Sequence, residues 1–187
     1  YAVRSSSTHE DGESSSFAGQ FASVLNVATL TDVLEAITHC QQSLTTDRAQ
    51  AYQAQHTTPE LSKMNVVIQQ MIQPRVAGVL FTANPTNGRR DQLIVDGVPG
   101  LGESLVSGHQ TPDHFVSDRS GRIVLSDIQQ NTPCLDEKDI HTLVIEALRG
   151  EQIWGCPLDF EWAIDHEGVL WWLQARPITK LPYDPRE

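Results

Sequence analysis

Apolar and polar residues alternate along two segments near the end of the chain, on either side of a turn-like cluster at residues 165–168. A period of two is typical of β-strands, so residues 158–164 and 169–176 predict a β-hairpin. One face of this hairpin is expected to be a hydrophobic core. That face contains Leu158, Phe160, Trp162, Ile164, Val169, Trp171, Leu173 and Ala175.

The opposite face of the predicted hairpin carries polar side chains. A short turn that pairs Asp165 with Gly168 would set Glu161 opposite Trp172 and Asp159 opposite Gln174. Side-chain alternation then collects Asp159, Glu161, Trp172, Gln174 and Arg176 on this face. Carboxylate and amide oxygens suit Mg²⁺, and a guanidinium suits phosphate. The face is therefore either an ordinary solvated sheet surface or the floor of a site for a metal–nucleotide complex.

The rest of the chain predicts a mixed α+β fold with antiparallel hairpins rather than a regular βαβ series. Helices are expected at 31–44, 47–55 and 136–149, with Thr29 or Thr31 and Asp136 as candidate N-caps. Residues 9–16 read as a polar loop, and a short turn or helix is expected from residue 100. Strands are expected at 1–6, 21–27, 65–72, 76–82, 92–96, 114–116 and 122–126.

Composition restricts the class of protein. The length of 187 residues accommodates one sizeable domain or two small lobes. The net charge of −11 argues against broad binding to nucleic acid or to anionic membranes. No apolar run approaches the roughly 20 residues of a membrane span. Cys40, Cys134 and Cys156 form no C-x-x-C pair, which predicts buried free thiols in a reducing compartment, the cytoplasm.

Two segments near the N-terminus have chemistry suited to phosphate. Arg4 ends a strand-like run and is followed by serines, and an arginine can bind phosphate through two hydrogen bonds. Residues 16–20 form a loop in which Gly19 permits close approach of backbone N–H groups to an anion. Each segment taken alone also fits an exposed strand end or an ordinary loop, and neither is a standard nucleotide-binding motif.

Taken together and in order, a series of short motifs resembles the nucleotide-binding domain of pyruvate phosphate dikinase, phosphoenolpyruvate synthase and rifampin phosphotransferase. The resemblance spans almost the whole chain, and the ordered set is far more specific than any one motif. The matching segments are VRSS (3–6), SFAGQ (16–20), DRA (47–49), QQM (69–71), GVLFTANP (78–85), GLGESLVSG (100–108), TPD (111–113), DFEW (159–162) and QARPIT (174–179).

The resemblance implies an ATP-grasp-like α+β fold, with antiparallel sheets, flanking helices and two lobes that close over ATP. It also implies site residues at the matching positions, with ATP and Mg²⁺ as the cofactors and with catalytic roles for the two arginines. Arg4 would hold the phosphates of ATP, and the loop that contains Gly19 would cover them. Gln69 and Met71 would lie near adenine. Mg²⁺ would be held by Glu161 and Gln174 with the support of Asp159, and Arg176 would contact the β- and γ-phosphates.

The resemblance implies that residues 1–180 form the nucleotide-binding domain and that 181–187 begin a linker. In the family, phosphate passes from ATP to a histidine in a T-S-H motif on a swivelling domain, and then to an acceptor bound by another domain. None of the seven histidines here lies in that motif, so all are read as structural or surface residues. The family's lysine upstream of VRSS is also missing. The chain is therefore expected to be a fragment that is inactive alone.

Three functions remain open at this point. The first is the ATP-binding part of a dikinase-type phosphotransferase acting on pyruvate or on an antibiotic. The second is the same domain in a natural-product ligase. The third is a non-catalytic ATP-binding module.

Overall fold

The computed structural model describes residues 1–7, 11–12, 15–16, 23–42, 64–106, 108, 110–129 and 131–182. The chain divides into two compact units, Tyr1–Met71 and Ile72–Glu187, and each has a hydrophobic core of its own. Every strand pairing in the described residues is antiparallel. The predicted α+β class with antiparallel hairpins is confirmed.

The first unit is built around a sheet in which β1 (Ala2–Ser7) lies between β4 (Ser23–Val24) and β5 (Met64–Gln69). The short strands β2 (Asp11–Gly12) and β3 (Ser15–Ser16) pair separately. The helix α1 (Leu30–Gln42) contributes Ala36 and Cys40 to a small core that also contains Val3 and Val27. The helix expected at 47–55 lies outside the described residues.

Thr29 rather than Thr31 is the N-cap of α1. The Thr29 hydroxyl oxygen accepts a hydrogen bond from the backbone N–H of Asp32 at 3.2 Å. The Asp32 carboxylate accepts one in return from the backbone N–H of Thr29 at 3.0 Å. Two of the N–H groups that a helix start leaves unsatisfied are therefore paired locally.

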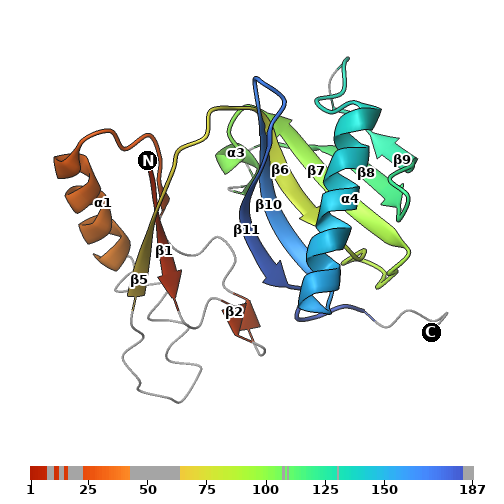
Figure 1. Cartoon of the computed structure of the whole chain (residues 1–187), viewed down its shortest axis with the longest axis horizontal. Helices are drawn as coiled ribbons and strands as arrows, with labels where there is room; N and C mark the ends of the chain where they lie inside the picture. The colour runs from red at the N-terminus through yellow and green to blue at the C-terminus, as the bar shows by residue number, and fades with distance from the viewer. Residues whose placement is uncertain are drawn as a thin grey trace. The chain divides into compact units, whose positions relative to one another are not determined.

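The second unit is a six-stranded sheet in the order β11-β10-β6-β7-β8-β9, with one long helix across one face (Figure 1). The strands are β6 (Pro74–Phe81), β7 (Gln92–Pro99), β8 (Asp113–Asp118), β9 (Ile123–Asp127), β10 (Leu158–Asp165) and β11 (Leu170–Pro177). A short helix, α3 (Glu103–Val106), follows β7, and the long helix is α4 (Glu137–Trp154). Ile140, Leu143, Val144 and Ala147 of α4 are buried in the core of this unit.

Trp162 is a fully buried side chain of this core, and it lies over two glycines. Gly78 and Gly97 are directly paired across β6 and β7. A Cβ atom on Gly78 would stand 2.8 Å from Trp162 Cζ2, and one on Gly97 would stand 3.4 Å from Trp162 Cη2. The missing side chains leave the space that the indole occupies, so these strand glycines have a packing role.

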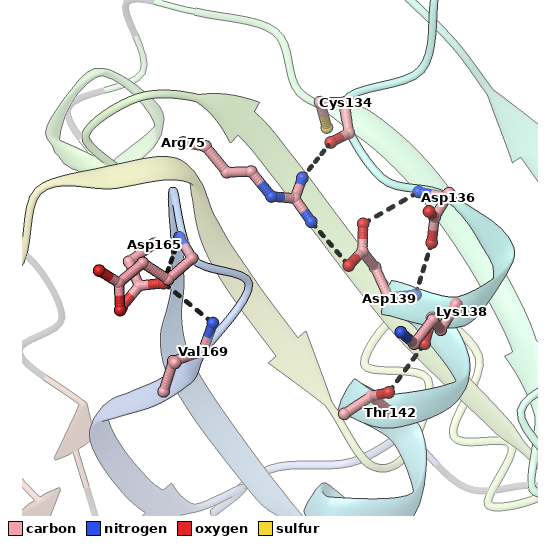
Figure 2. Close-up of polar contacts among 9 residues, drawn as sticks. Arg75, Cys134, Asp136, Lys138, Asp139, Thr142, Asp165 and Val169 are labelled. Atoms are coloured by element: carbon pink, nitrogen blue, oxygen red, sulfur yellow. Dashed lines mark hydrogen bonds and ion pairs between the residues drawn. The ribbon is translucent and has the colours of Figure 1, made fainter.

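Both ends of α4 are fixed by hydrogen bonds. Asp136, the predicted cap, accepts from the Asp139 N–H at 2.8 Å, and Asp139 accepts from the Asp136 N–H at 3.2 Å. Figure 2 shows that Arg75 of β6 also donates to the Asp139 carboxylate, at 2.7 Å. At the other end, Gly155 has a φ of 72° and donates to the carbonyl oxygen of Glu151. The predicted helix is confirmed and continues to Trp154.

The closing hairpin is confirmed as β10 and β11, but its predicted register is wrong. Leu173 is an extra residue on β11 at a β-bulge, so the pairing shifts by one residue along the hairpin. The observed pairs are Ala163 with Trp171, Trp162 with Trp172, Glu161 with Gln174, Phe160 with Ala175, and Asp159 with Arg176.

The bulge reverses the predicted faces of the residues that precede it on β11, because a shift of one residue moves a side chain to the other face. Trp172 packs against the core, with its ring centroid 4.5 Å from that of Phe160. Trp171 lies on the opposite face, where its Nε1 donates to Asp165 Oδ2 at 2.9 Å. Val169 was predicted in the core, but it precedes β11 and is 46% exposed.

The three cysteines are free thiols, as predicted. Cys40 is buried, whereas Cys134 and Cys156 are only half-buried. Burial, assisted by the neighbouring Asp113 carboxylate, raises the pKa of the Cys134 thiol to about 12. Among the described helices, none combines the length and the apolar character that crossing a membrane requires.

Candidate functional site

The face of the second sheet that points away from α4, here called the distal face, presents side chains in rows. Residues directly opposite each other on antiparallel strands point to the same side of the sheet, so the register defines each row. The central row consists of Gln174, Glu161, Val79, Asp96, His114 and Asp127. The adjacent row consists of Arg176, Asp159, Phe81, Ile94, Val116 and Leu125.

Glu161 and Gln174 are neighbours across β10 and β11 because of the bulge. The predicted register placed Trp172 opposite Glu161, whereas the observed one places an amide there. Directly paired residues have Cβ atoms about 4.5–5.5 Å apart, close enough for a carboxylate and an amide oxygen to bind one small cation. Both side chains are half-buried.

The donor set of Glu161 and Gln174 fits a cation that completes its shell with other oxygens. Within the described ranges, no group of three or more His, Cys, Asp or Glu side chains could hold a metal ion. A cation at this pair would therefore take its further ligands from water or from a bound molecule. Mg²⁺ has this coordination preference, since it is usually bound through one or two carboxylates together with water and substrate phosphates.

Asp159 and Arg176 form an ion pair beside Glu161 and Gln174. Arg176 Nε and Nη2 both donate to Asp159 Oδ2, at 2.8 Å and 2.6 Å. The Asp159 side chain is only 11% exposed and the Arg176 side chain 20%, so solvent screens the pair weakly. Asp159 therefore holds the guanidinium group in one orientation on the distal face.

The glycine-rich segment after β7 also lies on the distal face. Gly100 has a φ of 74° and donates from its N–H to the carbonyl oxygen of Arg75 at 2.9 Å. A Cβ atom on Gly102 would stand 3.5 Å from the Cβ of Ala77, which shares the distal face with its partner Ala163. This segment therefore covers the apolar end of that face, beyond the central row.

The remaining predicted site residues belong to the first unit or are not described. Arg4 is half-buried on β1, opposite Val67 of β5. Gln69 is the last residue of β5, and Met71 ends the unit. Gly19 lies outside the described residues. The structure thus brings four of the predicted residues together on β10 and β11, in the second unit.

Asp96 and His114, which are neighbours in the central row, belong to no site predicted from the sequence. His114 Nδ1 and Asp96 Oδ1 are 2.6 Å apart, with the side chains 37% and 20% exposed. His114 was read from the sequence as structural or surface, and Asp96 as a strand residue. Only the register of β7 with β8 brings the two side chains together in line with Glu161.

Comparison with known proteins identifies the family. The protein-family model described as "Pyruvate phosphate dikinase, AMP/ATP-binding domain" matches residues 1–130 and 121–186 of this chain. The chain belongs to this family. The resemblance that the sequence motifs indicated is confirmed.

Relatives of the pyruvate phosphate dikinase AMP/ATP-binding family carry several names. A "Rifampicin phosphotransferase" of a Streptomyces species is 37% identical over 205 residues, which cover 97% of this chain and 24% of the relative. "Prodigiosin synthesizing transferase PigC" of Serratia marcescens is 35% identical over 202 residues, covering 95% and 22%. A "Phosphoenolpyruvate synthase" of Pyrococcus furiosus is 34% identical over 215 residues, covering 96% and 26%. The chain spans about a quarter of the length of these relatives.

Proposed function

We propose that this chain is the ATP-binding part of a dikinase-type phosphotransferase. The observation that carries the proposal is the side-by-side arrangement of the Glu161–Gln174 pair and the Asp159–Arg176 ion pair, in a member of an AMP/ATP-binding family. The fold would be ATP-grasp-like, with two lobes that close over ATP. Residues 1–180 would form the nucleotide-binding domain, and residues 181–187 would begin a linker to further domains.

Glu161 and Gln174 would hold Mg²⁺ through their side-chain oxygens. Bound there, the ion would supply positive charge next to the phosphates of the nucleotide. Arg176 would bind the β- and γ-phosphates, because a guanidinium presents several donors in a plane that matches phosphate oxygens. Asp159 would keep that guanidinium oriented before the nucleotide arrives.

The first unit would contribute the other contacts. Arg4 would bind the phosphates, the backbone around Gly19 would cover them, and the segment of Gln69 and Met71 would lie against adenine. Phosphoryl transfer requires mainly positioning and electrostatic stabilisation, which arginines and one bound metal ion can supply without a covalent step on this chain.

In the complete protein, phosphate would pass to a histidine on a swivelling domain and then to an acceptor. The relatives named phosphoenolpyruvate synthase and rifampicin phosphotransferase indicate pyruvate-type and antibiotic acceptors as the two alternatives. We place the protein in the cytoplasm, where ATP and reduced thiols coexist.

A natural-product transferase is a second candidate, because the Serratia relative has that role in its name. Labelling of the full-length protein with ATP carrying a radioactive β- or γ-phosphate distinguishes a phosphohistidine relay, whatever its acceptor, from a non-catalytic ATP-binding module. An acid-labile, base-stable protein label is expected of a phosphohistidine relay. A protein that binds ATP without acquiring any label would instead be a non-catalytic module.

Calorimetric titration of the chain with ATP, with and without Mg²⁺, tests the site. We expect Mg²⁺-dependent binding that Glu161→Ala and Arg176→Ala each weaken by about tenfold or more, as the loss of a charge-assisted contact implies. Arg122→Ala is the matched control, because Arg122 is a 77% exposed arginine on the β8–β9 turn. Undiminished affinity in both site variants would contradict the assignment.

A further inference from the structure

The Asp96–His114 pair lies in the same central row of the distal face as Glu161 and Gln174. Asp96 is separated from Glu161 in the central row only by Val79 of the intervening strand. Adjacent strands lie about 4.8 Å apart, so the backbones at Glu161 and Asp96 are about 9.6 Å apart. A nucleoside triphosphate can span that distance from its metal-binding phosphates to its sugar.

The geometry of the pair leaves the Asp96 carboxylate held but accessible. His114 Nδ1 is 2.6 Å from Asp96 Oδ1, and within the described part of the chain no other side chain is bonded to this carboxylate. Asp127, the β9 residue opposite His114, is exposed. Asp96 Oδ2 is therefore a hydrogen-bond acceptor on the distal face, at a fixed position.

Charge determines which part of a nucleotide suits this acceptor. A carboxylate repels phosphate oxygens, but it accepts hydrogen bonds from hydroxyl groups, as acidic residues do from ribose in dinucleotide-binding folds. Val79 separates Asp96 from the cation-binding pair by one apolar position.

We propose that Asp96 binds a ribose hydroxyl of ATP and that His114 is a positioning residue that orients the Asp96 carboxylate. This assignment rests on the proposed function, because it takes the phosphates to be bound at Glu161, Gln174 and Arg176. It makes Asp96 a determinant of sugar specificity in the site.

The test compares ATP with 2′-deoxy-ATP, 3′-deoxy-ATP and tripolyphosphate, each with Mg²⁺, by calorimetry on the chain. Asp96→Ala is expected to weaken ATP by about tenfold, the effect of losing a hydrogen bond to a charged group. The same variant should leave one deoxynucleotide and tripolyphosphate at their wild-type affinities. His114→Ala should reduce the preference for ATP over that deoxynucleotide, and His114→Asn, which retains a donor, should restore part of it.

Asp127→Asn is the control for a change of charge. Asp96→Asn keeps the size of the side chain and is measured beside Asp96→Ala, so that a loss of binding can be separated from a loss of folding in the alanine variant. Equal loss of affinity for ATP and for both deoxynucleotides in Asp96→Ala would overturn the assignment, as would a wild type that does not distinguish the three nucleotides. If the wild type bound neither Mg-ATP nor Mg-tripolyphosphate, the proposed function itself would be contradicted. The assignment of Asp96 to a ribose hydroxyl would then be overturned as well.

Discussion

Asp118 organises the turn between β8 and β9. Its Oδ1 accepts from the Ser120 hydroxyl at 2.6 Å, and its Oδ2 accepts from Arg122 Nε at 3.0 Å. These bonds, chiefly the one from Ser120, lower the pKa of the carboxyl group from 3.8 to about 2. A depressed pKa means that the ionised carboxylate stabilises the folded state above the unfolded pKa, and that this contribution is lost as the pH falls through the folded pKa.

Asp118→Asn should therefore change the acid dependence of stability. The difference in urea midpoint between wild type and variant should be largest above about pH 4 and should shrink towards about pH 2, where the wild-type carboxyl also becomes neutral. Asp127→Asn, an exposed carboxylate outside the turn, is the control. A difference that stays constant from pH 5 to pH 2, in about half-unit steps, would disprove the linkage.

Gly78 is a position at which one added carbon should be costly. A Cβ there would stand 1.9 Å from the backbone oxygen of Asp96 as well as 2.8 Å from Trp162. The paired strand would have to move, so Gly78→Ala should lower the free energy of unfolding by about 3 kcal/mol or more, at the upper end of overpacking effects. Gly102→Ala is the control, because its Cβ would make an ordinary contact with Ala77 at 3.5 Å. Equal denaturant midpoints for both variants would refute the packing role.

At the level of elements, α4 depends on its N-terminal capping box. Asp136→Ala removes one of two reciprocal bonds and should destabilise the second unit by about 1 kcal/mol. Asp139→Ala removes the other bond and also the acceptor of Arg75, so it should cost more. Lys138→Ala, an exposed residue of the same turn, should change little. Urea unfolding followed by circular dichroism provides the ranking, and a Lys138 variant as unstable as the Asp139 variant would contradict it.

Local patterns predicted most of the elements, because the signals for them are local. Alternation marked the closing hairpin, and Asp136 marked the start of α4. The bulge at Leu173 could not be read from the same pattern. Trp171 and Trp172 are adjacent and equally suited to a core, so the sequence does not indicate which of them faces inward. Only packing against Phe160 settles that choice.

At the scale of the whole molecule, the candidate site depends on contacts between distant segments. Parity along β10 and β11 predicted that Asp159, Glu161, Gln174 and Arg176 share a face, and the register confirms this. The neighbours of β10 could not be predicted, because alternation does not reveal that β6 pairs with β10 and also with β7. The polar pair at Asp96 was therefore missed.

The predicted ligand contacts divide between the two units, which leads to a prediction about the whole chain. Arg4 lies on β1 of the first unit, whereas Arg176 lies on β11 of the second. If both bind one ATP molecule, Mg-ATP should slow amide hydrogen exchange in both units, since a ligand bound only to the native state suppresses openings of each segment that it contacts. Arg176→Ala should remove the protection from β1 as well as from β11, and Arg122→Ala should preserve it. Protection confined to β10 and β11 in the wild type would show that the nucleotide is held by the second unit alone.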